Sequence, residues 1–161
     1  MTYRTICKSI ATAVIGSALL AGTAFAQQAS DIDDVKAADL AFHVALSAMD
    51  AKAMAGLWAN KPYVTNIGPR SKSIEVGYAD AVTKWITTTV PNGFSELKAT
   101  MKSIDAIQTD GKVAWVVGVE SATGKTKAGE PFTFDTIVTN IYEKEGNKWL
   151  MVSHHAQIPP K

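Results

Sequence analysis

The chain has 161 residues, of which 47% are hydrophobic, and 16 Lys and Arg residues oppose 15 Asp and Glu residues to give a formal net charge of +1. This length suits a single domain. Neutralising phosphates takes clustered lysines and arginines, and the chain has no basic stripe, so its charge pattern argues against a nucleic-acid partner.

The N-terminus has the pattern of a signal peptide. Arg4 and Lys8 precede an apolar run over residues 10–21, and Ala24-Phe25-Ala26 supplies the small side chains that signal peptidase accepts. The run of about a dozen residues is shorter than the roughly 20 that a membrane-spanning helix needs. A signal peptide over residues 1–26 is therefore favoured over a membrane anchor.

We expect cleavage after Ala26, which leaves a mature domain of residues 27–161 with its core at about 31–156. This domain would be periplasmic or secreted, with no further contact with the membrane. Cys7 is the single cysteine and leaves with the peptide. The mature domain is thus expected to have neither a disulfide nor a thiol nucleophile, and its core alone must stabilise it.

The first half of the mature domain is expected to be mainly helical. Ser30 and Asp33 resemble a capping box, and apolar residues recur at steps of three or four from residue 32 to 49, typical of an amphipathic helix. The elements expected next are a short helix (51–58), a β-hairpin (63–67 with 74–76) and a third helix (78–87), followed by a break at Pro91-Asn92-Gly93.

From residue 94 onward the pattern is typical of strands, at 94–107, 113–123, 132–144 and 148–156. Their short connectors require antiparallel neighbours, because a parallel return needs a dozen or more residues. The predicted fold class is α+β, with three N-terminal helices on one face of a curved, mainly antiparallel sheet. Such a sheet often curls into a cone whose mouth stays open, which predicts an apolar pocket.

Alternation along the strands separates the two faces of the sheet. One set in the third strand is more apolar than the other; its members are Phe132, Phe134, Thr136, Val138, Asn140 and Tyr142. The run Val113 to Val119 is almost continuously apolar, which indicates that both faces of its strand are covered. Helices can cover one face, and we expect a second copy of the chain to cover the outer face in a homodimer.

Asp39 and His43 lie one turn apart on the first helix, with Asp39 inside its apolar stripe. A carboxylate in an apolar pocket has a raised pKa and can act as a general base. The alternative is an ordinary Asp–His contact at the edge of the buried face. His154 and His155 must point to opposite faces of their strand, so one of them is expected in the cavity as an acid or base, unless both are structural.

Trp58 and Tyr63 flank the expected cavity mouth, and Tyr63 or Asn140 would supply a polar group that assists the acid or base. Together with His43 and His155 they complete the predicted ligand pocket, with Asp39 and His154 as candidate catalytic residues. The chain has three histidines and no cluster at metal-ligand spacing. Gly124-Lys125-Thr126 lacks the upstream glycine of a phosphate-binding loop. We expect neither a metal nor another cofactor.

Several segments of the chain together resemble SnoaL-like proteins of the nuclear transport factor 2-like superfamily, over about Ile32 to Ala156. The segments are Trp58 to Gly68, Gly77, Trp85, Val113-Ala114-Trp115 and Lys148 to His155. The resemblance implies a conical α+β domain, usually dimeric, with a hydrophobic pocket. The superfamily includes ketosteroid isomerases, polyketide cyclases, epoxide hydrolases, dehydratases and non-catalytic binding or assembly domains. Similar domains that bind small carboxylates present arginines from the last two strands, whereas Asn140 stands at the corresponding place here.

Three functions remain open from the sequence. The first is a domain that binds a small, mostly apolar molecule, and the second is an acid–base enzyme of the isomerase, cyclase or hydratase type acting on such a molecule. The third is an assembly module whose cone is filled by its own side chains. A roomy pocket that holds a buried carboxylate or histidine beside a hydrogen-bond donor would favour the enzyme.

Overall fold

A computed structural model of the chain describes the backbone of residues 15–160 and the side chains of residues 27–160. Residues 1–14, the start of the predicted signal peptide, lie outside the described residues, and cleavage after Ala26 stays a prediction. Within residues 15–160, no helix combines the length and the apolar character that crossing a bilayer requires.

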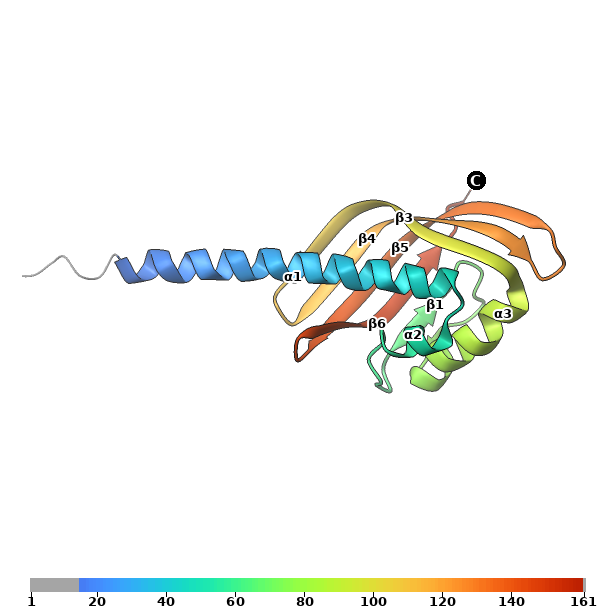
Figure 1. The fold of residues 1–161 in the computed structure, drawn as a ribbon, viewed down its shortest axis with the longest axis horizontal. Helices are drawn as coiled ribbons and strands as arrows, with labels where there is room; N and C mark the ends of the chain where they lie inside the picture. The colour runs from blue at the N-terminus through green and yellow to red at the C-terminus, as the bar shows by residue number, and fades with distance from the viewer. Residues whose placement is uncertain (1–14, 161) are drawn as a thin grey trace, which may run out of the picture.

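The first helix, α1 (Ile15–Ser47), lies across the sheet, and its N-terminal part projects past it (Figure 1). It begins well before the predicted capping box, so Ser30 lies inside the helix and is no cap. Alanine is the most frequent residue in the segment before Ser30, and it favours helix. The predicted buried face is confirmed, because Val35, Phe42 and Leu46 are at most 5% exposed.

Helix α2 (Ala51–Ala55) is shorter than predicted. Asp50 caps it by accepting hydrogen bonds from the backbone amides of Lys52 and Ala53. The helix stops before Trp58 because the chain there pairs with the last strand instead: the amide of Met151 donates to the carbonyl of Leu57. Tertiary hydrogen bonds therefore decide where this helix ends.

The third helical segment consists of a π-helix, η1 (Ala79–Thr89), that runs directly into α3 (Val90–Gly93). The predicted break at 91–93 is wrong. Pro91 sits in the first turn of α3, and the fixed φ of proline fits helical geometry, so the helical backbone continues through it to Gly93. Helices α2, η1 and α3 gather at one end of the sheet, beside the C-terminal end of α1 (Figure 1).

The sheet has six strands in the order β2-β1-β6-β5-β4-β3. Their bounds are β1 (Thr65–Ile67), β2 (Glu75–Val76), β3 (Phe94–Thr109), β4 (Val113–Thr126), β5 (Pro131–Glu145) and β6 (Lys148–Gln157). The predicted hairpin β1–β2 and the antiparallel series β3 to β6 are confirmed. The sequence did not reveal the parallel pairing of β1 with β6, which places Asn66 opposite His154.

The inner face of the sheet packs against α1 and carries the core. Val138, Asn140 and Tyr142 are at most 1% exposed, which confirms the alternation predicted for this strand. The outer face keeps exposed apolar side chains, with Trp115 at 42% and Ile137 at 54%. The chain itself therefore covers only one of the two faces of the near-continuous apolar run in β4.

Candidate functional site

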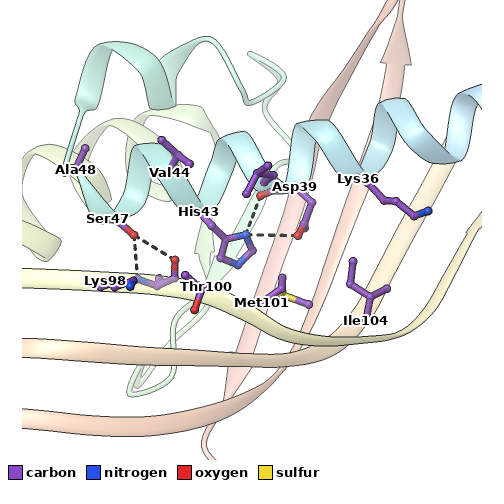
Figure 2. Close-up of a pocket in the computed structure, with 12 residues that line it drawn as sticks. Lys36, Asp39, His43, Val44, Ser47, Ala48, Lys98, Thr100, Met101 and Ile104 are labelled. Carbon is purple, nitrogen blue, oxygen red and sulfur yellow. Dashed lines mark hydrogen bonds and ion pairs between the residues drawn. The ribbon is translucent and has the colours of Figure 1, made fainter.

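A pocket of about 720 Å³ lies between α1 and the edge strand β3. Figure 2 shows its walls, which are mainly apolar and include Val44, Met101 and Ile104. Asp39 and His43, both 2% exposed, form its floor. The pocket exists because β3 is an edge strand, so no further strand fills the space beside the helix.

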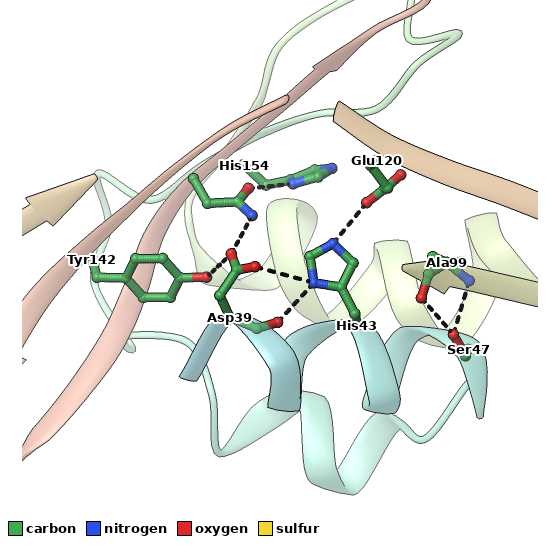
Figure 3. Close-up of polar contacts among 8 residues, drawn as sticks. Asp39, His43, Ser47, Ala99, Glu120, Tyr142 and His154 are labelled. Carbon is green, nitrogen blue, oxygen red and sulfur yellow. Dashed lines mark hydrogen bonds and ion pairs between the residues drawn. The ribbon is translucent and has the colours of Figure 1, made fainter. Parts of the chain in front are cut away.

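The Asp39 carboxylate points from α1 toward the inner face of the sheet (Figure 3). Its Oδ1 accepts hydrogen bonds of 2.8 Å from the Asn140 amide and from the Tyr142 hydroxyl, both on β5. Burial first, and then the charge of Asp39, raise the pKa of Tyr142 well above its usual value, so the hydroxyl keeps its proton and donates. Oδ2 of Asp39 lies 3.4 Å from Nδ1 of His43.

The His43 imidazole lies between two carboxylates. Its Nδ1 donates to the backbone carbonyl of Asp39 at 2.7 Å, since a carbonyl oxygen can only accept. Its Nε2 is 3.1 Å from Oε2 of Glu120 on β4. Burial acts to lower the pKa of His43, but the hydrogen bond with Glu120 and the charges of Asp39 and Glu120 outweigh it, and the pKa is raised above 6.5. These contacts favour a ring protonated on both nitrogens.

His154 on β6 joins the cluster through Asn140. Its Nδ1 lies 2.7 Å from Oδ1 of Asn140, whose amide group donates to Asp39. Nδ1 of His154 must therefore be the donor. Burial lowers the pKa of His154 to about 4, so this ring is neutral at neutral pH. The two buried histidines thus differ in charge, because only His43 touches a carboxylate.

This arrangement places the Asp39 carboxylate and the His43 imidazole side by side at the floor of one pocket. Within residues 27–160, the 3.4 Å approach of His43 is the one polar contact of Asp39 Oδ2. That oxygen can take a proton from a bound molecule, as a general base does. The charge of a protonated His43 beside it can stabilise negative charge that develops on the molecule.

Four of the predicted site residues meet in this cluster. Asp39 and His43 line the pocket, while Asn140 and His154 lie behind them and contact Asp39 directly or through one hydrogen bond. The open question of which adjacent histidine faces inward is answered by the burial of His154.

The remaining three predicted pocket residues lie elsewhere. Trp58 is buried in the core, 6.3 Å from the Phe42 ring, and lines no part of the pocket. Tyr63 is 51% exposed and donates to Glu143 at the surface, because its neighbour Val64 takes the inward position. His155 points to the outer face, as strand alternation requires once His154 is inside.

Two residues of the cluster were not assigned a role from the sequence. Glu120 follows an apolar run on β4, and its even spacing from Ala114 and Val116 places it on the buried face. The sequence therefore does contain a signal for Glu120: a carboxylate at a position that alternation assigns to the buried face. Tyr142 was placed on the inner face, but nothing in the sequence indicated that its hydroxyl would meet Asp39, which lies 103 positions away.

Within the part of the chain that the structure describes, no group of three or more His, Cys, Asp or Glu side chains is placed to hold a metal ion. In the cluster, Asp39 and Glu120 approach opposite nitrogens of the same His43 ring. The two carboxylates therefore both interact with the His43 imidazolium that lies between them.

Comparison with known proteins supports the fold. A family model described as a SnoaL-like domain matches residues 35–160. No protein among the curated sequences matches the chain. Among solved structures, the chain is similar to a nuclear transport factor 2-like superfamily protein from Salmonella enterica, with 18% identity and a TM-score of 0.75, over 83% of this chain and 94% of that one.

Two further solved structures show the same architecture. A candidate dehydratase of the NTF2-like family from Streptomyces avermitilis has 18% identity and a TM-score of 0.72, over 82% of this chain and 99% of that one. An NTF2-like protein of unknown function from Pseudomonas putida has 10% identity and a TM-score of 0.69, over 83% and 89%. At these identities the likeness shows a shared fold and leaves the chemistry to the residues of each site.

Proposed function

The chain belongs to the SnoaL-like domain family and has the NTF2-like fold, and from this premise we propose that it is an acid–base enzyme acting on a small, mostly apolar molecule. The molecule binds in the pocket between α1 and β3, and Asp39 is the general base. One observation carries the proposal: a carboxylate and an imidazole, each 2% exposed, adjoin at the floor of a pocket with mainly apolar walls.

The size and lining of the pocket support a small-molecule ligand. Its volume of about 720 Å³ lies within the roughly 300–1,000 Å³ of typical ligand pockets. Leu40 and Val44 on α1, and Met101 and Ile104 on β3, contribute to its apolar lining. Burying apolar ligand surface against such walls supplies binding energy without hydrogen bonds, and the polar floor then sets the orientation.

The proposed reaction is a proton transfer at carbon. Asp39 Oδ2 removes a proton next to a ligand carbonyl, the electron pair moves toward the carbonyl oxygen, and the His43 imidazolium stabilises that charge. Asp39 then returns the proton, to the same carbon or a neighbouring one. Tyr142 and Asn140 hold the carboxylate in place through Oδ1 and leave Oδ2 for the ligand.

Exchange of carbon-bound hydrogen in deuterated water tests this directly. The probes are 2-cyclohexen-1-one and 1-tetralone, and mass spectrometry measures the deuterium that each gains. Asp39→Asn keeps the shape of the side chain and removes its charge, and it should slow exchange by about 10²–10⁴-fold. Asp34→Asn, an exposed position on the same helix, is the matched control and should leave the rate unchanged.

The same experiment has a clear negative outcome. Binding of either probe is followed by the amide signals of Met101 and Ile104 in two-dimensional NMR spectra. If a probe binds there and the protein gives no exchange above buffer, or if Asp39→Asn exchanges as fast as the wild type, the acid–base function is wrong.

Non-catalytic binding is the second candidate, and one observation favours it. Both ring nitrogens of His43 and Oδ1 of Asp39 already have partners within the protein. A cluster so fully paired can serve as a rigid polar floor for ligand recognition alone. The negative outcome above, with binding retained in Asp39→Asn, is the result expected of this function.

We also propose that two copies associate through the outer face of the sheet, and that the chain is exported and cleaved after Ala26. Exposed apolar side chains on this face, including Trp115 and Ile137, support the dimer. Native mass spectrometry of the protein from its own host measures both the number of subunits and the N-terminal residue. A monomer, or a mass that retains residues 1–26, would contradict the respective proposal.

A further inference from the structure

A second pocket, of about 380 Å³, lies at the end of the sheet where η1 and α3 meet the turn between β1 and β2. It shares no lining residue with the pocket between α1 and β3. Its inner wall is formed by Trp85, Val90, Phe94 and Phe134, and Arg70 and Lys72 stand on the turn at its edge. We propose that this second pocket binds a small aromatic carboxylate.

The aromatic part of the ligand would rest on a preformed aromatic surface. The rings of Phe94 and Phe132 lie 5.0 Å apart, and those of Phe132 and Phe134 lie 5.5 Å apart. Phe94 and Phe134 are only partly buried, so their rings have surface left to cover. Aromatic pairs at such distances add stability beyond the area they bury.

The charge at the edge of the pocket selects the carboxylate. Arg70 is the only arginine in residues 15–160, and its guanidinium carbon lies 5.1 Å from the centre of the Phe134 ring. Among residues 27–160, neither Arg70 nor Lys72 has a salt bridge to a carboxylate. An arginine placed over an aromatic ring keeps its N–H groups for a planar anion, which it can bind with two parallel hydrogen bonds.

Glu75 is the one carboxylate that lines this pocket, and it does not cancel the two cations. Its Oε2 accepts a hydrogen bond of 3.3 Å from the Asn66 amide, on the strand beside it. Burial raises the pKa of Glu75, and the carboxylate opposes the two cations with a single formal charge. The balance of formal charges around the pocket is therefore positive, as an anionic ligand requires.

The test uses 2-naphthoate as the probe and 2-naphthamide, its uncharged analogue, as the control ligand. Both are titrated into the purified, isotope-labelled protein, and amide chemical shifts give the position and affinity of binding. We expect 2-naphthoate to shift the backbone amide signals of Gly68 and of residues 70–73, and 2-naphthamide to bind more weakly. Arg70→Gln should weaken 2-naphthoate binding by about tenfold, the value of one charged hydrogen bond.

Variants separate this pocket from other sites and from general charge effects. Lys72→Gln should also weaken binding, while Lys112→Gln, an exposed lysine on the β3–β4 turn, removes the same charge elsewhere and should leave binding unchanged. Asp39→Asn should not affect it, because Asp39 lines only the other pocket. Arg70 is exposed, and circular dichroism verifies that Arg70→Gln folds.

Three results would each overturn the proposal. The first is the absence of shifts at Gly68 and residues 70–73 up to the solubility limit of 2-naphthoate. The second is equal affinity for 2-naphthamide, which would show an apolar pocket without anion selection. The third is unchanged binding in both Arg70→Gln and Lys72→Gln. None of these results depends on the acid–base activity proposed for Asp39, so the two proposals fail separately.

Discussion

Removal of the Tyr142 hydroxyl tests how strongly the buried cluster holds Asp39. Tyr142 is 1% exposed, and its hydroxyl donates to Asp39 Oδ1 at 2.8 Å. The Tyr142→Phe variant keeps the ring, and thus the apolar packing, and deletes one donor to a buried carboxylate. A hydrogen bond to a charged group contributes about 1.5–3 kcal/mol. We expect the free energy of unfolding to fall by that amount.

Tyr63→Phe is the matched control for this change. It removes the same kind of bond, from a tyrosine hydroxyl to a carboxylate oxygen at 2.7 Å, but Tyr63 is 51% exposed. Water replaces the lost partner there, so we expect no measurable change in stability. The two variants therefore differ in burial and not in the atoms deleted.

Thermal and urea denaturation, followed by circular dichroism, measure both variants. The expected loss in Tyr142→Phe corresponds to a drop in Tm of about 6–12 °C for a domain of this size. In the Asp39→Asn background the bond joins two neutral groups, and the cost of Tyr142→Phe should fall to about 0.5–1.5 kcal/mol. Equal losses in Tyr142→Phe and Tyr63→Phe, or the same cost in both backgrounds, would refute the reasoning.

Three further changes have defined outcomes. Because the folded pKa of His154, about 4, lies below its unfolded value of 6.5, the folded state binds fewer protons. The free energy of unfolding should thus fall by on the order of 3 kcal/mol as the pH falls from 6.5 to 4. This part of the loss should vanish in His154→Gln, and urea denaturation across that pH range measures it. Gly118→Ala should destabilise the fold by about 1–3 kcal/mol, because the added Cβ would lie 2.1 Å from a β3 carbonyl oxygen. In the control Gly93→Ala, the added Cβ meets nothing within 4 Å. Similar melting temperatures for the two variants would contradict the clash. Ile137→Lys should convert the proposed dimer to a monomer in native mass spectrometry. Ile74→Lys, which changes a similarly exposed residue that precedes β2, should not.

Local patterns were sufficient for most of the sheet. Alternation in β5 assigned Val138, Asn140 and Tyr142 to the buried face, and the structure confirms it. The short connectors between β3, β4, β5 and β6 required antiparallel neighbours, and these pairings are present. Such features depend on residues close together in the chain, where period and turn chemistry decide the outcome.

Helix ends were predicted less well, because contacts from distant segments decide them. The segment after Ala55 leaves the helix to pair with β6, which lies about a hundred positions later in the chain. The capping pattern predicts that the first helix starts at Ser30, yet α1 runs through this residue. A cap signal marks a permitted start of a helix and does not enforce one.

The candidate site was predicted in part. Asp39 and His43 share a helix face by their spacing alone, and the sequence indicated their pairing and the two alternatives for its role. Their order in the chain predicts that Trp58 and Tyr63 lie at the cavity mouth. The orientation of each side chain, however, depends on which neighbouring residue takes the core position. Tyr63 turned outward because Val64 is fully buried.

By itself, the sequence determined the fold class, the inward set of β5 and the placement of a carboxylate and a histidine on one turn of the first helix. Only the tertiary structure decided that Glu120, Asn140 and Tyr142 converge on that pair, and that the pocket opens beside the edge strand. The physical reason is that hydrogen bonds between side chains 77 to 103 positions apart depend on how helix and sheet pack. No local period encodes that packing.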